Sequence, residues 1–281
     1  MKKNKTLVIT GATGYIGSRL LSFLNTYDYE VIVTKRINQN EFQYFNTNDL
    51  EIPLKRFDDN KEIILIHLAT FFSKDNSKKN EIHKSNIFFG KELLNDLGKY
   101  NLKKVVYTNS MFKYYTDKKI QSLEYTISKN LFSSFLTEFT KKNDIALDEI
   151  FLDNTFGLKD NRDKVIPNIF NAILLNNSNP VKNKNVFINL VYIEDIIHRL
   201  LFSIEDLKSS RTSFISNYTL NIDSIYNFLL NLKKHDLLDY DLIIKGKNTY
   251  LKNSPVIDLK HISLTKIDDI LAKELKNYES H

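Results

Sequence analysis

Three of the seven glycines in this chain lie within seven residues, at Gly11, Gly14 and Gly17. They follow a short β-branched run at residues 6–10 and precede residues 15–21, whose apolar side chains have helical spacing. This order predicts a strand that turns directly into a helix, with the glycines in the turn. The first glycine permits a tight turn, the second lets backbone approach a pyrophosphate, and the third allows close packing of helix on strand. The pattern therefore predicts a dinucleotide-binding turn with phosphates at the helix N-terminus.

Further apolar runs at residues 30–34, 62–69 and 104–108 read as strands, and residues 86–100 have helical spacing between the last two. Alternation of strands and helices indicates a parallel sheet with helices on both faces. The expected fold class is α/β, a Rossmann-type doubly wound parallel sheet with a small C-terminal substrate-binding region. In such a sheet a ligand lies at the carboxyl ends of the strands.

This reading divides the chain into two parts. We expect a dinucleotide-binding domain at residues 1–157, completed by about 186–203. The substrate-binding region is expected at about 158–185 and 204–281. Helices without a mechanistic role are expected at Ser224–Lys234 and Thr265–Lys276.

Composition restricts the class of protein. Hydrophobic residues make up 42% of the 281 residues and charged residues 26%, as in soluble globular proteins. The chain has no cysteine, which excludes disulfides, thiolate metal sites and a cysteine nucleophile. Its six histidines show no short ligand spacing, so no metal site is expected.

The charge pattern and hydropathy also bear on partners and location. The net charge is +6, but lysines alternate with acidic residues along the chain, which favours a solvated surface over nucleic-acid binding. No apolar run approaches the roughly 18 residues needed to span a membrane. The first residues lead straight into a strand without a signal-peptide core. We expect a cytoplasmic protein that does not bind membranes.

Tyr125 and Lys129 form a second informative pattern. Residues four apart share a helix face, so the Lys129 ammonium is expected near the Tyr125 phenol. A nearby cation lowers a phenol pKa of about 10, which makes the phenol a usable proton donor or acceptor near neutrality. The preceding strand ends at Ser110, whose hydroxyl is placed to bond the same substrate oxygen. Since the chain has 15 tyrosines, the spacing also arises by chance on exposed helices.

Taken in order, several motifs resemble the extended short-chain dehydrogenase/reductases, the NAD-dependent epimerase/dehydratase family, which act on nucleotide sugars. The resemblance runs from about residue 5 to residue 225, and its compact form is most similar to nucleotide-sugar 4-ketoreductases. The motifs are Thr10–Gly17, Ile66–Ala69, Asn86, Val106–Ser110, the Tyr125/Lys129 pair, Asn154–Gly157 and Val191–Asp195.

The resemblance implies roles for individual residues. Tyr125 is then the catalytic acid/base, Lys129 holds the nicotinamide ribose and tunes Tyr125, and Ser110 orients the reacting carbonyl or hydroxyl. A homodimer is also implied. The implied cofactor-binding residues are Gly11, Thr13, Gly14, Tyr15, Ile16, Gly17, Lys35, Arg36, Leu68, Ala69, Thr70, Tyr125 and Lys129. The implied substrate-binding residues are Ser110, Met111, Asn154 and Lys164.

The chain departs from the family pattern at the end of the second strand. Lys35 and Arg36 stand where the family has an acidic residue that binds the ribose hydroxyls of NAD. Two cations favour the 2′-phosphate of NADP, so NADP(H) is the expected cofactor. Two solvated basic residues in a lysine-rich chain would give the same pattern.

Two arginines of the family pattern are also replaced. Phe151 and the Ile188-Asn189 pair occupy their positions, so the usual contact to the substrate diphosphate is in doubt. Candidate replacement cations are Lys182, Lys184 and Arg211.

The residues after Ser110 restrict the reaction. Dehydratases of the family place an acid pair there, whereas this chain has Met111 and Phe112, which argues against 4,6-dehydration. The expected function is NADPH-dependent reduction of the 4-keto group of a nucleotide-linked (deoxy)sugar for surface polysaccharide such as lipopolysaccharide. A nucleotide-sugar 4-epimerase with tightly bound NAD is the alternative, and a non-catalytic dinucleotide-binding regulatory protein is a further one. The nucleotide, the sugar and the stereochemistry stay open.

Overall fold

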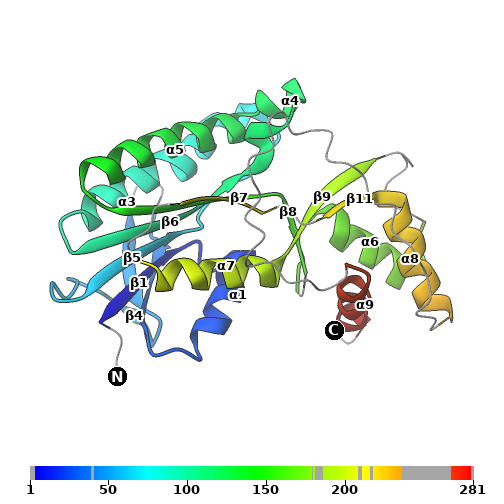
Figure 1. Cartoon of the computed structure of the whole chain (residues 1–281), viewed down its shortest axis with the longest axis horizontal. Coiled ribbons are helices and arrows are strands. Elements are labelled where there is room, and N and C mark those ends of the chain that lie inside the picture. Colours follow the sequence, from blue (N-terminus) through cyan, green and yellow to red (C-terminus); the bar gives the residue numbers. More distant parts are fainter. Residues whose placement is uncertain are drawn as a thin grey trace.

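The computed structural model describes residues 4–38, 41–157, 159–178, 180, 186–207, 211–215, 218–235 and 267–279. An eight-stranded sheet with the order β10-β7-β6-β5-β1-β2-β3-β4 forms the larger part (Figure 1). Its strands are β1 Lys5–Thr10, β2 Glu30–Arg36, β3 Phe42–Asn46, β4 Asp49–Pro53, β5 Glu62–His67, β6 Leu102–Ser110, β7 Ala146–Leu152 and β10 Arg211–Ile215.

The expected doubly wound parallel sheet is confirmed. Strand β1 pairs in parallel with β2 on one side and β5 on the other, so the chain reverses its direction of winding at β1. That reversal leaves a crevice at the carboxyl ends of β1 and β5, where ligands bind in open α/β sheets. The run expected to extend to residue 69 ends as a strand at His67.

One edge of the sheet differs from the prediction. Strand β3 pairs antiparallel with β2, and β4 antiparallel with β3. Residues 49–52 of β4 alternate polar and apolar side chains, but the run is short, all five residues of the strand are exposed, and no strand was predicted there.

Helices cover both faces of this sheet (Figure 1). Helices α1 and α7 contact each other and pack with one apolar cluster. Helices α3 and α5 contribute to a second cluster on the opposite face. The residues expected to form one helix at 86–100 form a π-helical turn followed by α3. The bounds are α1 Tyr15–Leu24, η1 Asn76–Lys78, α2 Lys79–His83, η2 Lys84–Phe88, α3 Phe89–Leu97, η3 Met111–Tyr114, α4 Lys118–Gln121, α5 Glu124–Lys142 and α7 Ile193–Glu205.

A smaller part lies beside the sheet (Figure 1). It contains a three-stranded sheet of order β11-β9-β8 and three helices, of which α8 and α9 correspond to the two helices expected near the C-terminus. Strand β10 belongs to the main sheet, where it pairs with β7, and not to the C-terminal region in which the sequence placed it. The bounds are β8 Asn154–Phe156, α6 Val165–Leu174, β9 Phe187–Tyr192, β11 Tyr218–Asn221, α8 Ile222–His235 and α9 Ile267–Glu279.

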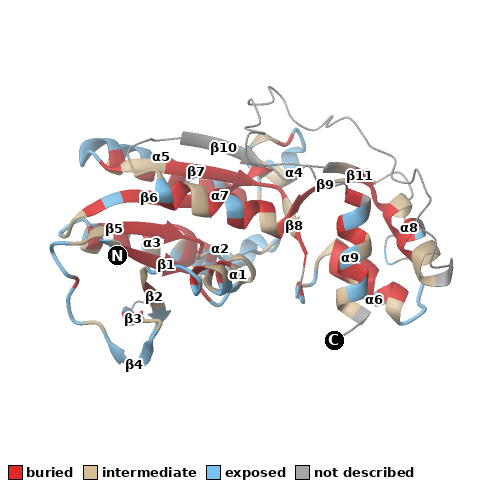
Figure 2. Cartoon of the chain, turned by 60° about the horizontal axis from the view of Figure 1, so that its bottom comes forward, coloured by how far each residue is buried: buried red, intermediate tan, exposed pale blue. Residues whose placement is uncertain are grey.

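Burial follows the layers (Figure 2). Along β1, Leu7 and Ile9 pack into the cluster shared with α1 and α7, whereas Val8 packs into the cluster shared with α3. This alternation is the period of a strand covered on both faces. Among the described residues no helix is long and apolar enough to cross a membrane.

Candidate functional site

The glycine turn between β1 and α1 has the geometry that its sequence predicts. Gly11 has a φ of +67°, and a Cβ there would lie 2.7 Å from the backbone nitrogen of Ala69. A Cβ on Gly17 would lie 2.2 Å from the Gly11 carbonyl oxygen, so only glycine allows α1 to approach the turn this closely. Gly14 is the N-cap of α1, and no side chain caps the helix. The N-terminal amides of α1 are thus available to a phosphate.

Thr10 joins the ends of β1 and β5 and was not singled out by the sequence. Its Oγ1 accepts hydrogen bonds from the backbone nitrogens of Leu68 at 3.1 Å and Ala69 at 3.0 Å. Because these contacts use its lone pairs, the hydroxyl donates its proton to Nδ1 of His67 at 2.9 Å. Burial, together with the nearby charge of Lys129, lowers the pKa of His67 to about 3, so this acceptor stays neutral. Thr10 thereby fixes the backbone of the predicted cofactor contacts Leu68 and Ala69.

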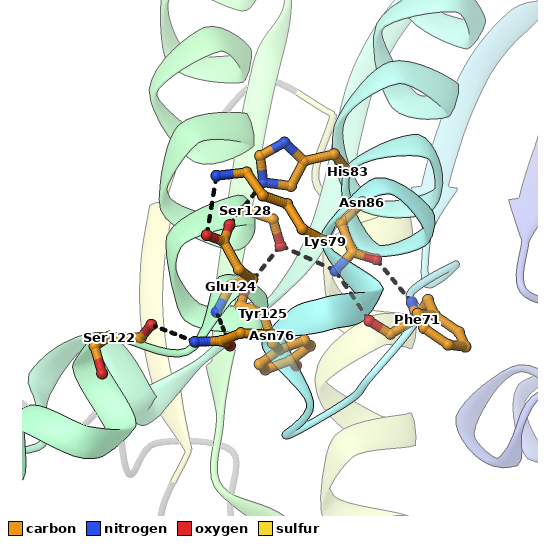
Figure 3. A network of polar contacts seen from close by, with 9 residues as sticks. All are labelled: Phe71, Asn76, Lys79, His83, Asn86, Ser122, Glu124, Tyr125 and Ser128. Atoms are coloured by element: carbon orange, nitrogen blue, oxygen red, sulfur yellow. Dashed lines mark hydrogen bonds and ion pairs between the residues drawn. The ribbon is translucent and has the colours of Figure 1, made fainter.

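Asn86 fixes the next stretch of the same loop (Figure 3). Its Oδ1 accepts from the Phe71 nitrogen at 2.7 Å and from Thr70 Oγ1 at 3.2 Å. Its Nδ2 donates to the Phe71 oxygen at 3.1 Å and to Ser128 Oγ at 3.0 Å. Since Ser128 lies on α5, Asn86 ties the loop after β5 to the helix that carries Tyr125.

The N-terminus of α5 is held by a second group of contacts (Figure 3). Glu124 pairs with Lys79 Nζ and with His83 Nε2, each at 3.0 Å. The Lys79 contact is the main cause of a lowered pKa for the Glu124 carboxyl. The Glu124 nitrogen donates to Asn76 Oδ1 at 3.1 Å. The residue before Tyr125 is therefore fixed on both its backbone and its side chain.

Tyr125 is half-buried, and its hydroxyl is hydrogen-bonded with the side chains of Ser110 and Thr70. Burial raises the pKa of Tyr125 to about 12, although the two hydrogen bonds act in the opposite direction. The pKa lowering expected from Lys129 is therefore not found. Removal of the phenolate from water outweighs the favourable contacts.

Lys129 is turned toward the strand β6. Its Nζ donates to the Thr108 oxygen at 2.8 Å and lies 4.6 Å from the centroid of the Tyr107 ring. Burial lowers the pKa of Lys129 to about 7, and the negative charge of Glu149 opposes that shift. The predicted group of Ser110, Tyr125 and Lys129 thus gathers at the carboxyl end of β6.

Aromatic rings and a lysine cover Tyr125. The Phe72 ring lies 4.9 Å from the Tyr125 ring, edge to face, and Lys164 Nζ lies 4.1 Å from the centroid of Phe72. Burial, followed by the charges of Arg162 and Lys74, lowers the pKa of Lys164. The predicted substrate residue Lys164 therefore lies near Tyr125, separated from it by the Phe72 ring.

Met111 does not present its side chain as predicted. It is completely buried in a cluster with Tyr115 and Phe151. Because the whole residue is 0% exposed, the structure shows no accessible part of Met111 for the predicted substrate contact.

The two basic side chains at the end of β2, those of Lys35 and Arg36, point in different directions. Lys35 Nζ donates to the Leu50 oxygen at 2.7 Å and lies 4.4 Å from the Phe45 ring centroid. The Arg36 guanidinium lies 6.0 Å from the Phe89 ring centroid. Consecutive strand residues point to opposite faces, so both cations lie at the end of β2 but on different sides.

The remaining predicted site residues belong to the glycine turn or to the substrate-binding region. Thr13 is exposed and Ile16 half-buried beside Tyr15, whose ring lies 4.1 Å from the Arg162 guanidinium. Asn154 Nδ2 donates to the Asn189 oxygen at 3.0 Å. The proposed replacement cations Lys182, Lys184 and the side chain of Arg211 lie outside the described residues. Within the described ranges no cluster of His, Asp or Glu is suited to hold a metal ion.

A doubly wound sheet, a glycine turn that leaves a helix N-terminus open, and a Tyr-Lys pair across the crevice define a dinucleotide-binding protein of the short-chain dehydrogenase/reductase class. The chain belongs to the NAD dependent epimerase/dehydratase family, which residues 7–218 match.

Individual relatives are distant. A CDP-abequose synthase from Salmonella muenchen is 24% identical over 206 residues, which are 70% of this chain and 69% of that protein. A UDP-N-acetylglucosamine 4-epimerase from Methanobrevibacter ruminantium M1, solved with UDP-N-acetylmuramic acid, has a TM-score of 0.74 and 20% identity and covers 100% of this chain and 99% of its own. The Bordetella bronchiseptica enzyme WbmF with NADH has a TM-score of 0.76 and 18% identity, with 99% and 93% covered. These structures show the same fold across the described parts of the chain.

Proposed function

We propose that this protein reduces the 4-keto group of a nucleotide-linked sugar or deoxysugar with NADPH. The observation that carries the proposal is the Tyr125 hydroxyl, which is hydrogen-bonded with the side chains of Ser110 and Thr70. Reduction of a ketone creates an alkoxide that must receive a proton. A phenol that burial keeps protonated has that proton to give.

Each residue of the site has a separate role in the proposed reaction. A bound nicotinamide supplies the hydride to the keto carbon. Tyr125 donates its proton to the carbonyl oxygen, and Ser110 donates a hydrogen bond to the same oxygen as charge develops on it. Lys129, fixed on the Thr108 oxygen, holds a positive charge beside the cofactor ribose.

The glycine turn fits the cofactor pyrophosphate. Side chains at Gly11 or Gly17 would collide with backbone, and the N-terminus of α1 has no side-chain cap. A 2′-phosphate would offer Lys35 a charged acceptor in place of the neutral Leu50 oxygen, which supports NADPH. The structural relative WbmF was solved with NADH, and titration of the wild-type protein with NADPH and with NADH decides the cofactor preference.

A nucleotide sugar is supported by the relatives, which are named for CDP- and UDP-linked sugars. It is also supported by Lys164, which lies against Phe72 next to Tyr125 and feels the positive charges of Arg162 and Lys74. Arg162 is neutralised by Asp160, with 2.6 Å between Nε and Oδ1. We assign the substrate diphosphate to Lys164 and Lys74.

The epimerase alternative uses the same Tyr125, Lys129 and Ser110, and one structural relative is named a 4-epimerase. The two reactions differ in where the hydride comes from. A reductase takes it from external NADPH at every turnover, whereas an epimerase returns the hydride that it removed and leaves the cofactor unchanged. A homodimer and a cytoplasmic location stay predictions.

The deciding experiment incubates the protein with deuterium-labelled NADPH and with CDP-, dTDP-, GDP- and UDP-linked 4-keto sugars. The expected result is deuterium at C4 of one product, with one NADPH consumed for each product formed. The Tyr125→Phe protein serves as the control for uncatalysed reduction. Conversion of a 4-hydroxy nucleotide sugar without added cofactor would instead establish the epimerase.

A further inference from the structure

Glu149 is a buried carboxylate beside the catalytic group that neither the sequence motifs nor the proposed reaction uses. It is 7% exposed and lies on β7, where it is the register partner of Tyr107 on β6. Its neighbour Asp148 points to the opposite face, where it pairs with Lys104 at 3.1 Å. Two buried acids in succession on one strand therefore have separate surroundings.

The contacts of Glu149 reach both elements that carry the catalytic residues. Its Oε1 accepts from Asn109 Nδ2 at 2.7 Å and from Ser133 Oγ at 2.6 Å. Asn109 Oδ1 accepts in turn from the backbone nitrogen of Ser110 at 2.7 Å. Ser133 lies one helical turn after Lys129 on α5, so the carboxylate connects the end of β6 to the face of α5 that carries the Tyr-Lys pair.

We propose that Glu149 is a positioning residue whose carboxylate fixes Ser110, through Asn109, against the face of α5 that carries Tyr125 and Lys129. This inference rests on the proposed function, because the spacing that Glu149 fixes is the one between Ser110 and Tyr125, the two hydrogen-bond donors of the proposed reaction.

The charge of Glu149 has a second effect. It favours the protonated form of Lys129 and opposes the larger effect of burial on that group. Burial raises the pKa of Tyr107 and of Tyr114, and the negative charge of Glu149 adds to both shifts. Lys113 and Glu138 face Glu149 across a cavity of about 450 Å³.

The test separates the charge from the hydrogen bonds. Glu149→Gln keeps an oxygen that accepts from Asn109 and Ser133 but removes the charge, whereas Glu149→Leu removes both. Asp148→Asn is the matched control, because it removes a buried charge from the same strand on the face away from the site.

The first readout needs no turnover. With lysine labelled at 13Cε, the signal that titrates near neutrality is assigned to Lys129 by its loss in Lys129→Met. The Glu149→Gln protein should move that midpoint to lower pH, since the negative charge of Glu149 favours the protonated form of Lys129. Asp148→Asn should leave the midpoint in place. An unchanged midpoint in Glu149→Gln, or an equal shift in Asp148→Asn, would overturn the charge effect whatever reaction the protein catalyses.

The second readout is steady-state turnover across pH. Glu149→Gln should keep its turnover number below the Lys129 midpoint, with the alkaline limb of kcat/KM moved to lower pH. Glu149→Leu should lose at least about tenfold in kcat, because small misplacements of donors are costly, while KM for the nucleotide sugar stays within about twofold. Wild-type turnover in a folded Glu149→Leu protein would overturn the positioning role. Absence of NADPH oxidation by wild-type protein would overturn the proposed function alone, since the lysine titration does not depend on it.

Discussion

Gly17→Ala should lower the stability of the fold, whereas Gly14→Ala should weaken NADPH binding. The two glycines nevertheless lie only one turn apart at the start of α1. A Cβ on Gly17 would lie 2.2 Å from the Gly11 oxygen and 2.8 Å from the Ala12 Cα, both of them backbone atoms of the turn. Neither can move without separating α1 from β1. A Cβ on Gly14 would meet the Gly11 oxygen at 3.2 Å, which needs a shift of only a few tenths of an ångström.

The magnitudes follow from these distances. Gly17→Ala should cost about 3 kcal/mol, the upper part of the range for overpacking a rigid site. In a protein of this size that lowers Tm by roughly 6–12 °C. Gly14→Ala should change stability by no more than about 1 kcal/mol, because Gly14 is exposed and its φ of −76° suits any residue. Its methyl group would stand where the pyrophosphate approaches, so NADPH binding should weaken at least about tenfold.

Thermal unfolding followed by circular dichroism and calorimetric titration with NADPH measure the two effects separately. A Gly17→Ala protein as stable as wild type would refute the packing argument. Wild-type NADPH affinity in a folded Gly14→Ala protein would refute the placement of the pyrophosphate at the N-terminus of α1.

Three further predictions concern the cofactor, the proton donor and pH. Lys35→Asp should weaken NADPH binding about 10- to 100-fold and leave NADH binding unchanged, since a charge-assisted contact contributes about 1.5–3 kcal/mol; a wild-type preference for NADH in the same titration would contradict it. Tyr125→Phe should lower turnover at least about a hundredfold with unchanged cofactor affinity, and Ser110→Ala should lower it less; a Phe variant that keeps most of its activity would make the phenol a bystander. Burial raises the pKa of Glu274, which accepts from the Tyr192 hydroxyl at 2.9 Å, so the folded state holds this proton more tightly than the unfolded chain does. Its contribution to stability is present below the ordinary glutamate pKa and lost as pH rises through the raised one; Glu274→Gln should flatten the fall of Tm as the pH rises above the ordinary glutamate pKa, and an unchanged slope would count against it.

The glycine turn and the Tyr-Lys pair could be read from sequence because each depends on local geometry. Gly17 must be glycine because a Cβ there would meet the backbone of Gly11 and Ala12 within the turn, and Gly11 because its φ is +67°; the close approach of Ala69 to Gly11 comes from a distant segment. The pair needs only the period of a helix. Such constraints can be recognised within a few residues of sequence.

Other parts of the site depend on contacts between distant segments. Thr10 acts because β1 and β5 are neighbours, and Lys164 reaches Phe72 because the loop before α6 returns to the loop after β5. Glu149 lies within a strand whose other residues are mostly buried and apolar, and a single sequence does not distinguish a strand acid that pairs from one that faces water. The signal available was the succession of two acids in an otherwise apolar run.

The expected pKa of Tyr125 was wrong in direction because the sequence argument considered its charged neighbour and not its burial. A helix pattern shows that Tyr125 and Lys129 share a face, but it does not show how deeply that face is buried. Desolvation depends on all the elements packed around a group, here including Phe72 and Phe112 from other segments. It is therefore the effect that a local pattern predicts least well.

The same burial acts in opposite directions on the two groups of the pair, and this determines how the proton is replaced. It raises the pKa of the Tyr125 phenol to about 12 and lowers that of the Lys129 ammonium to about 7. Once Tyr125 has given its proton to the product, it is a much stronger base than neutral Lys129 at any pH. Return of a proton to the Tyr125 phenolate is then downhill from the Lys129 ammonium. When two neighbouring groups have pKa values separated in this way, the group with the higher pKa serves as the acid. In the proposed reaction Tyr125 therefore starts each turnover protonated. Lys129 is then the group whose ionisation sets the pH dependence.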